Sequence, residues 1–301
     1  MVERGRFAPS PTGELHLGNA RTALLSWLWA RAAGGSYLLR VEDLDAPRVR
    51  PGLAAQQLDE LRWLGLDWDG EVVRQSTRAS AYDAAIARLG EHVYECFCSR
   101  AEIAAASAPH ALSDEGQRYP GTCRALTRAL REERRKVRAP AVRLRVPDGV
   151  IAFEDELAGP QAFDVQAQVG DFVLRRADGV HSYQLAVVVD DAESQVTQVL
   201  RGADLLPSTA RQLILYRLLG RPAPRWAHAP LLLSASGERL AKRDRSASLA
   251  ALRAEGQDPA AVVAQLAQLS GLPPRGSPRE LVAGFSLALV PRAPTRIPEP
   301  P

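Results

Sequence analysis

Two hydrophobic patterns alternate along the first 45 residues, and each predicts a different element. Residues 19–33 place large apolar side chains at helical spacing, so we expect a helix there that ends at Gly34 and Gly35. Short apolar runs on either side, residues 5–8 and 36–41, are typical of buried strands. Strand, helix and strand in this order form a βαβ unit, which predicts a parallel sheet with right-handed crossovers.

The rest of the chain predicts more helices and strands but no internal repeat. Helices are expected in two stretches between residues 53 and 92, around Trp63 and Trp68, and at residues 209–219, 249–254 and 259–269. Apolar and polar positions alternate between residues 141 and 200, which predicts strands at 142–146, 172–175, 183–189 and 195–200. The last 30 residues hold eight prolines, and we expect this tail to be frayed or disordered.

Composition narrows the class of protein. The chain has 301 residues, of which 46% are hydrophobic and 24% charged, as in a folded chain with two compact units or one enlarged enzyme domain. Its net charge of +3 excludes a protein that coats a polyanion over its whole surface, but permits a local nucleic-acid surface. Neither a bilayer-spanning apolar run nor a secretory signal is visible. We therefore expect a cytoplasmic protein that does not associate with membranes.

Two segments far apart in the chain have the chemistry of phosphate binding. Residues 9–13 form a loop rich in proline that leads to His16, Gly18 and Asn19 at the predicted helix start. Helix N-termini bind phosphate, His16 can donate to an anionic oxygen, and Gly18 has no Cβ to block a close approach. Downstream, Lys242 is one of only two lysines and lies in a basic loop that could fold over a triphosphate. A capped helix with an incidental histidine and a solvated charged turn are the plainer alternatives.

The order of these segments resembles the class I glutamyl-tRNA synthetases. Their opening is similar to residues 6–13 (RFAPSPTG), 16–19 (HLGN, at the family's HIGH element) and 40–45 (RVEDLD). Residues 182–191 (SYQLAVVVDD), 201–205 (RGADL) and 239–243 (RLAKR, at the KMSKS element) continue the resemblance in the same order. Arg239 and Ala241 depart from the Lys and Ser that are usual in this element, whereas Lys242 matches it. The resemblance covers about residues 4–250.

The resemblance implies an α/β fold: a Rossmann-like class I catalytic domain with a zinc-bearing insertion. We expect the first half of this domain at residues 1–92 and its second half, with the KMSKS-like loop, at 181–250. The insertion between them, at 93–180, contacts the tRNA acceptor end in the family. A short helical stub with a proline-rich tail is expected at 251–301. A conventional member continues with anticodon-binding domains of roughly 100 residues or more. We expect none here, as in the shortened branch of the family, the glutamyl-queuosine tRNA(Asp) synthetases.

For that branch the resemblance implies ATP-dependent activation of glutamate to glutamyl-adenylate without tRNA, then transfer to the queuosine base in the anticodon loop of tRNA(Asp). The implied partners are ATP with Mg²⁺, L-glutamate and tRNA(Asp) carrying queuosine, and we expect a monomer. Three alternatives are open: a minimal glutamyl-tRNA synthetase that charges an acceptor end, an inactive synthetase-like binding module, and a nucleotidyltransferase that shares only the phosphate motifs. The expected tRNA contact is residues 124–145, with nine basic and two acidic side chains, although a solvated Arg-rich helix fits equally.

The chemistry of glutamate predicts the residue types in its pocket. A side-chain carboxylate in a partly desolvated pocket needs a cation, and arginine grips it with two hydrogen bonds. By themselves Arg201 and Glu42 also fit a surface salt bridge. The resemblance instead assigns the glutamate site to Arg6, Ala8, Ser10, Glu42, Tyr183 and Arg201, with Glu42 suited to the α-ammonium and Tyr183 adding a hydroxyl donor. It assigns the ATP site to His16, Gly18, Asn19 and Lys242, and the catalytic phosphate contacts to His16 and Lys242.

Three clustered cysteines predict a metal site. Cys96, Cys98 and Cys123 are an odd set in a chain without a secretory signal, which favours metal binding over disulfides, although unrelated reduced thiols remain an alternative. Three thiolates suit Zn²⁺ in a closed tetrahedral site. The resemblance implies one structural zinc with Tyr119 as the fourth ligand. Other candidates for that position are His110, His92 and Asp114.

Overall fold

The computed structural model describes residues 2–106, 112–113, 116–234, 237–238 and 248–297. The strands are β1 Arg4–Phe7, β2 Ser36–Val41, β3 Val73–Arg74, β4 Val93–Cys96, β5 Leu112–Ser113, β6 Gly116–Gln117, β7 Ala141–Leu144, β8 Ile151–Asp155, β9 Gly159–Phe163, β10 Val173–Arg175, β11 Gln198–Gly202, β12 Arg225–Ala229, β13 Leu232–Leu233 and β14 Thr295–Arg296. The helices are α1 Leu17–Ala32, α2 Leu53–Trp63, α3 Ala79–Leu89, α4 Arg100–Ala106, α5 Arg128–Val137, α6 Val165–Gln168, α7 Tyr183–Glu193, α8 Leu206–Leu218, α9 Leu249–Ala254, α10 Pro259–Leu269 and α11 Pro278–Val282.

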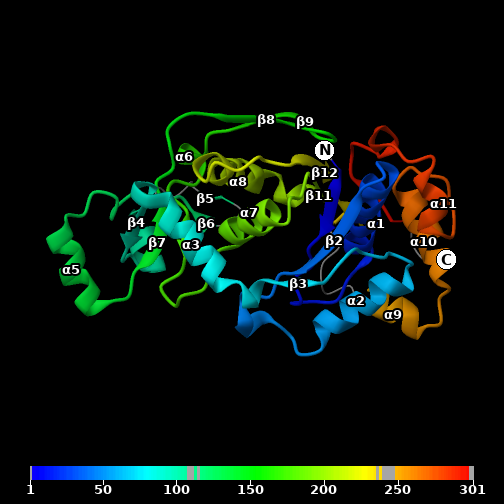
Figure 1. Cartoon of the computed structure of the whole chain (residues 1–301), viewed down its shortest axis with the longest axis horizontal. Helices are drawn as coiled ribbons and strands as arrows, with labels where there is room; N and C mark the ends of the chain where they lie inside the picture. The colour runs from blue at the N-terminus through cyan, green and yellow to red at the C-terminus, as the bar shows by residue number, and fades with distance from the viewer. Residues whose placement is uncertain (1, 107–111, 114–115, 235–236, 239–247, 298–301) are drawn as a thin grey trace.

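Two mainly parallel sheets form the centre of the molecule (Figure 1). One has the order β1-β2-β3 and the other β11-β12-β8-β9, in which only β8 and β9 are antiparallel to each other. The backbone N–H of Thr197, just before β11, donates to the carbonyl oxygen of Arg4 at 2.9 Å, so the two sheets meet there. The predicted α/β fold is confirmed, and the predicted βαβ unit is present as β1, α1 and β2.

Helix α1 is buried on almost every side. Eleven of its 16 residues are buried, because it packs on β1 on one side and against α10 and α11 on the other. Strand β1 approaches it closely: a Cβ on Gly5 would lie 2.9 Å from the Cβ of Ala30. This close approach fixes the distance between the sheet and the helix whose N-terminus lies at the cavity described below.

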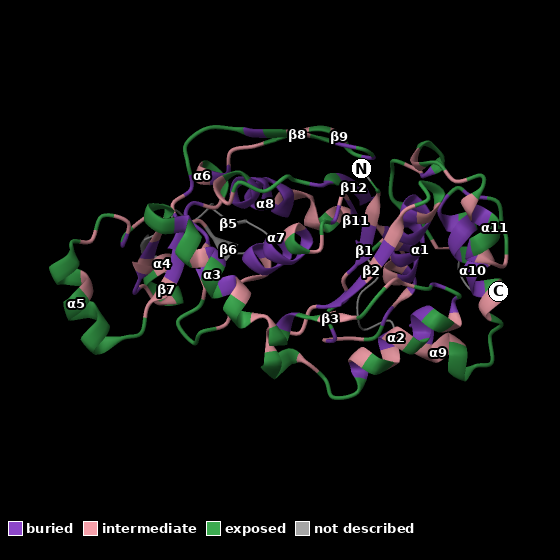
Figure 2. Ribbon diagram, in the orientation of Figure 1, coloured by how far each residue is buried: buried purple, intermediate pink, exposed green. Residues whose placement is uncertain are grey.

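The prediction of a strand at residues 183–189 is wrong, because these residues belong to helix α7. The side chain of Ser182 caps the helix by accepting a hydrogen bond from the backbone N–H of Leu185. Residues 184–191 are all buried, in a core that α7 shares with α3 and α8 (Figure 2). A helix that is buried all round shows no polar face, so its apolar run resembles a buried strand in sequence.

The prediction of a frayed tail is also wrong for residues 273–297. Pro278 occupies the first turn of α11, where its missing N–H costs no hydrogen bond. Leu281 and Val290 are buried in the core around α1, and β14 pairs in parallel with β13. The composition of this segment is misleading because several of its few apolar side chains, among them Leu281 and Val290, pack into the core. Trp68 is a smaller correction, since it lies between α2 and α3 and not in a helix.

The segment between β4 and β10 forms most of one end of the molecule (Figure 1), and its strands β7 and β10 share a hydrophobic core with α3, α7 and α8. Its sheet has the antiparallel order β10-β7-β4, and we call this sheet with α4 and α5 the cysteine module. Strands β8 and β9 leave it, and β8 pairs with β12 through Asp155 and Trp226. The predicted insertion therefore contributes two strands to a central sheet, while the domain boundaries themselves stay a prediction. None of the described helices combines the length and apolar character that crossing a bilayer requires.

Candidate active site

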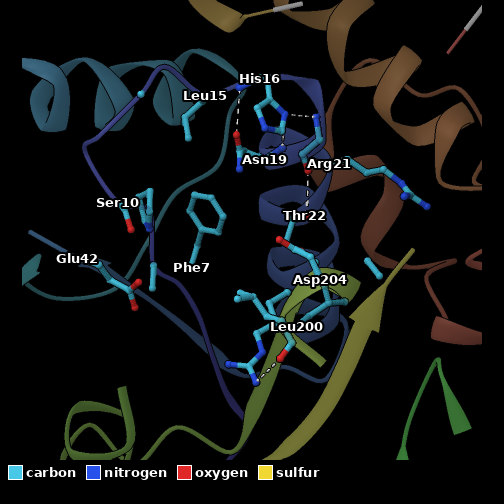
Figure 3. Close-up of a pocket in the computed structure, with 18 of the residues that line it drawn as sticks. Phe7, Ser10, Leu15, His16, Asn19, Arg21, Thr22, Glu42, Leu200 and Asp204 are labelled. Carbon is cyan, nitrogen blue, oxygen red and sulfur yellow. Dashed lines mark hydrogen bonds between the residues drawn. The ribbon is translucent and has the colours of Figure 1, made fainter. Parts of the chain in front are cut away.

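A cavity of about 750 Å³ opens where β1, β2, β11 and β12 end (Figure 3). Ligands of parallel α/β sheets bind at this edge, and this volume is typical of a ligand pocket. Every described residue that the sequence predicts for the glutamate and ATP sites lines it: Arg6, Ala8, Ser10, His16, Gly18, Asn19, Glu42, Tyr183 and Arg201. Lys242 lies outside the described residues. Ser248, the first residue described after Lys242, forms an antiparallel bridge with His16.

The two predicted arginines differ in their partners. Arg6 donates from Nε and from one terminal nitrogen to the two carboxylate oxygens of Asp191, at 3.3 Å each. Arg40 donates to the same carboxylate at 2.6 Å, and also to Glu42 at 3.3 Å. Burial raises the pKa of Asp191, but the two guanidinium groups outweigh it and hold this pKa below its usual value. The charge of Arg6 is therefore largely compensated inside the protein.

Arg201 is only 4% exposed and has a different set of partners. Its Nε donates to Nε2 of His228 at 3.0 Å, and its terminal nitrogens donate to Gln212, Thr209, Tyr183 and the carbonyl oxygen of Leu205 at 2.8 to 3.4 Å. Within the described residues, none of its hydrogen bonds goes to a carboxylate. Burial lowers the pKa of Arg201, which reflects the cost of a charge without a bound anion. The wall of the cavity thus holds a cation that is oriented but not neutralised.

Glu42 and Tyr183 complete the polar wall around these arginines. Glu42 follows β2 directly, and burial raises the pKa of its carboxyl although Arg40 and Arg6 counteract that rise. The hydroxyl of Tyr183 accepts a hydrogen bond from Arg201 at 3.3 Å, and burial raises its pKa. Ser10 and Glu42 enter the cavity from the same side in Figure 3, and His16 and Asn19 lie at its other end. One end of the cavity can therefore hold the ammonium and carboxylate groups of an amino acid, and the other end can hold a phosphate group.

His16 acts as the N-cap of α1. Its Nδ1 accepts hydrogen bonds from the backbone N–H groups of Gly18 at 3.1 Å and Asn19 at 3.4 Å, and the side chain of Asn19 accepts from the backbone N–H of His16. The sequence predicts that the N–H groups at this helix end bind phosphate. In the structure two of them donate to the histidine ring instead, so the ring occupies the position next to the helix end. Because Nδ1 accepts, a neutral ring carries its proton on Nε2.

Gly18 is required by this ring. A Cβ on Gly18 would lie 2.9 Å from Cε1 and 3.0 Å from Nδ1 of His16. We expect Gly18→Ala to displace the ring and to lower the glutamate-dependent rate of ATP–pyrophosphate exchange by about ten-fold to a hundred-fold. Stability is not the readout, because alanine favours the helix and offsets part of the lost cap.

The matched control for Gly18→Ala is His16→Asn. Asparagine is a good N-cap, so the helix end is kept while the imidazole is removed. Similar losses of exchange in both variants, measured at saturating glutamate, would locate the effect in the ring. Wild-type exchange in Gly18→Ala would show that the ring position is unimportant.

His228 is buried beside Asp155 and Arg201 in a neutral form. Burial lowers its pKa from 6.5 to about 4, although the adjacent carboxylate of Asp155 acts in the opposite direction and Arg201 reinforces the decrease. An unfolded histidine binds a proton below about pH 6.5, whereas the folded one stays neutral down to about pH 4, so the folded state loses stability as the pH falls through this window. Between pH 7 and pH 5 we expect this residue alone to cost about 2 kcal/mol. Urea unfolding at both pH values should show a smaller loss in His228→Gln, and an equal loss would contradict the assignment.

The three cysteines and Tyr119 come together as predicted from the resemblance. The three sulfur atoms lie within 4.8 Å of one another, and Sγ of Cys98 is 3.5 Å from Sγ of Cys123. The hydroxyl oxygen of Tyr119 lies 3.3 Å from Sγ of Cys96 and 3.9 Å from Sγ of Cys98. Tetrahedral zinc with Zn–S bonds of about 2.3 Å places its ligand atoms about 3.5 to 3.8 Å apart, so the donors fit.

The protonation of these thiols also favours a cation. Burial and the neighbouring sulfur atoms raise the pKa of Cys98 to about 12, whereas, against the effect of burial, the hydroxyl of Tyr119 and the guanidinium of Arg143 hold the pKa of Cys96 below its usual value. A second thiolate in this cluster therefore needs a compensating positive charge. The guanidinium of Arg143 stacks 3.8 Å from the ring centre of Tyr119 and helps to fix it. Of the alternative fourth ligands, His92 is exposed and is not among the clustered groups, and His110 and Asp114 lie outside the described residues.

Sequence reasoning missed several residues of the site. Asp191 and Arg40 lie inside matched segments but were assigned no role, and the contact between Asp191 and Arg6 spans 185 residues. Asp155 and His228 were not considered at all. A buried histidine flanked by apolar residues in β12 was the only signal for His228, and nothing in the sequence pairs it with a carboxylate in β8.

Comparisons with known proteins agree with this geometry. Residues 3–284 match the family described as tRNA synthetases class I (E and Q), catalytic domain. The Glutamyl-Q tRNA(Asp) synthetase of Symbiobacterium thermophilum is 56% identical over an alignment of 312 positions, which covers 98% of this chain and 95% of that protein. The protein of the same name from Nocardia farcinica is 54% identical over 96% of this chain and 91% of that protein.

Solved structures show the same fold. The crystal structure of a glutamate tRNA ligase from Elizabethkingia meningosepticum in complex with its amino acid superimposes with a TM-score of 0.86 at 30% identity, over 98% of this chain and 67% of that chain. The glutamate-tRNA synthetase of Elizabethkingia anophelis also has a TM-score of 0.86, at 29% identity. The chain therefore belongs to the class I tRNA synthetases (E and Q) and is a glutamyl-tRNA synthetase-like ligase.

Proposed function

We propose that this chain activates glutamate with ATP in the absence of tRNA and transfers it to the queuosine base of tRNA(Asp). The observation that carries the proposal is Arg201, a buried guanidinium on the cavity wall whose described hydrogen-bond partners are all neutral. A substrate with a side-chain carboxylate supplies the missing negative charge. The names of the relatives that are 54% and 56% identical support the choice of acceptor.

The cavity offers a separate contact for each charged group of glutamate. Arg201 supplies the uncompensated positive charge for the side-chain carboxylate, and Arg6 and Tyr183 add hydrogen-bond donors. Glu42 attracts the α-ammonium, since the two groups carry opposite charges and the Glu42 side chain is largely buried. Ala8 and Ser10, from the loop after β1, also line the cavity.

The reaction proceeds by direct displacement. An α-carboxylate oxygen of glutamate attacks the α-phosphorus of ATP, the bond to the β,γ-phosphates breaks, and pyrophosphate leaves with the electron pair. His16 and Lys242 stabilise the charge that builds up on the phosphates, with Gly18 and Asn19 shaping the helix end and Mg²⁺ entering with ATP. In the second step a nucleophilic group of the queuosine base attacks the glutamyl carbonyl carbon, and AMP leaves. Positioning and electrostatics supply the rate enhancement, since no covalent enzyme intermediate is formed.

The cysteine module has a structural role in this proposal. Cys96, Cys98, Cys123 and Tyr119 would hold one Zn²⁺, which when bound ties β4 to the chain after β6. None of these residues lines the active-site cavity, so the metal takes no part in the chemistry. The cytoplasmic location and the monomeric state stay predictions from the sequence.

Helix α5 is the candidate tRNA contact. None of its residues is buried (Figure 2), and five of its ten side chains are basic. Arg128, Arg134 and Lys136 are not cavity residues, so we expect Arg128→Glu/Arg134→Glu to reduce transfer to tRNA by about ten-fold or more and to spare adenylate formation. Transfer at 50 and 200 mM salt measures this effect, because lost phosphate contacts also lower the salt dependence. Equal loss of transfer and exchange would argue against this surface.

The test of the function uses one enzyme preparation and three tRNA samples. Glutamate-dependent ATP–pyrophosphate exchange without tRNA is expected, followed by transfer of labelled glutamate to tRNA(Asp) with queuosine and none to tRNA(Asp) without it. Charging of tRNA(Glu) instead would identify a minimal glutamyl-tRNA synthetase. Absence of exchange would identify an inactive binding module.

A further inference from the structure

Asp155 is held so that one carboxylate oxygen serves the backbone and the other serves a histidine. Its Oδ1 accepts three backbone N–H groups, from Leu157 at 3.0 Å, Ala158 at 2.8 Å and His228 at 3.0 Å. Its Oδ2 lies 2.5 Å from Nδ1 of His228. The two oxygen positions therefore have different environments, since three backbone N–H groups surround Oδ1 and only the histidine ring faces Oδ2.

This contact determines which nitrogen of His228 carries the proton. Arg201 can only donate, and its Nε–H points at Nε2 of His228 at 3.0 Å. Nε2 must therefore accept, so the ring proton is on Nδ1 and is donated to Asp155. Both side chains are about 1% exposed, so neither is in contact with bulk water.

A neutral acceptor has an advantage here that a carboxylate lacks. A carboxylate in direct contact with Arg201 would orient it but would also neutralise it, as Asp191 does for Arg6. The imidazole of His228 orients the guanidinium plane and leaves its positive charge for a ligand. The imidazole of His228 separates the negative charge of Asp155 from Arg201. Neither Asp155 nor His228 lines the cavity.

We infer that Asp155 and His228 are positioning residues for glutamate recognition, in which Asp155 sets the tautomer of His228 and His228 thereby orients Arg201. The inference rests on the proposed function, because it requires Arg201 to contact the substrate carboxylate. It also gives the inserted segment a role in the pocket: β8 leads from the cysteine module to β12 (Figure 1), and its last residue, Asp155, pairs with Trp226 of β12 and contacts His228.

The variant Asp155→Asn tests the tautomer directly. The amide oxygen takes the Oδ1 position among the three backbone donors, so the amide NH₂ faces Nδ1 of His228. The ring then shifts its proton to Nε2, where it opposes the Nε–H of Arg201. We expect KM for glutamate to rise at least about ten-fold, with KM for ATP unchanged and the unfolding midpoint within a few degrees of the wild type. An unchanged KM for glutamate overturns the inference.

Two substitutions of His228 separate positioning from packing. Glutamine places an amide oxygen near the position of Nε2 and can still accept from Arg201, so His228→Gln should keep KM for glutamate within about three-fold. Asparagine reaches only the Nδ1 position, so His228→Asn should raise this KM by at least about ten-fold. Equal effects of the two variants would assign His228 a purely structural role.

The double variant completes the test. Glutamine has no tautomer to set, so Asp155→Asn should add little to KM for glutamate in a His228→Gln background. A full additional increase would show that Asp155 acts independently of His228. The proposed function fails separately: wild-type protein without glutamate-dependent exchange, or without heat on calorimetric titration with glutamate, refutes that proposal before any variant is compared.

Discussion

Replacing Arg201 with methionine is expected to lower kcat/KM for glutamate in ATP–pyrophosphate exchange by about a thousand-fold. Arg201 is a cavity cation whose described hydrogen-bond partners carry no negative charge, so in the variant the substrate carboxylate would enter a pocket that no longer compensates it. Leaving one partner of a buried charge pair alone costs about 2 to 5 kcal/mol. Exchange measured over a range of glutamate concentrations gives the loss, and KM for ATP should stay close to its wild-type value.

The variant Arg201→Lys is the matched control. Lysine keeps the charge but replaces the planar fork with a single ammonium, so it cannot hold His228, Thr209 and Tyr183 together. We expect it to recover only part of the lost activity. If Arg201→Met retained full exchange while the protein stayed folded, the pocket would recognise its substrate elsewhere, and the assignment of Arg201 would be wrong.

Removal of the zinc is expected to unfold the cysteine module and to abolish transfer to tRNA. A structural zinc binds with a free energy of about 10 kcal/mol or more, which matches the entire stability of a typical domain. Cys123→Ser should reduce bound zinc from one equivalent to less than about half, and hydrogen exchange should show loss of protection in β4 and β7. Glutamate activation should persist, because the cavity is lined by other parts of the chain.

The variant Tyr119→Phe distinguishes the fourth ligand from the other three. It keeps the three thiols and the ring that stacks on Arg143, and removes only the phenol oxygen. Weaker zinc binding, measured by competition with a chelator, supports Tyr119 as a ligand, whereas unchanged binding assigns the fourth position to another group. Full zinc content in Cys123→Ser would contradict the site itself.

The sequence predicted correctly those helices and strands that are buried on one face only, or whose ends carry a recognisable cap or flanking strand. The βαβ unit at residues 4–41 was recognisable because two short apolar runs flank a long helical pattern. Helices α9 and α10 have the predicted bounds, since Ser248 and Asp258 cap their starts. Helix α7 was mistaken for a strand because it is buried all round, and burial on every side removes the periodicity on which prediction depends.

The sequence by itself determined which residues belong to the active site: its motifs, in their order, name residues that line the cavity. The clustered cysteines and the family resemblance together predict the metal ligands. Only the tertiary structure decided how charge is distributed among the active-site residues. Arg6 and Arg201 are equivalent in sequence, yet Asp191 compensates the first, and a neutral histidine held by Asp155 orients the second. These contacts join residues 27 to 185 positions apart, and hydrogen bonds at such separations follow from how the strands pack, which no local pattern encodes.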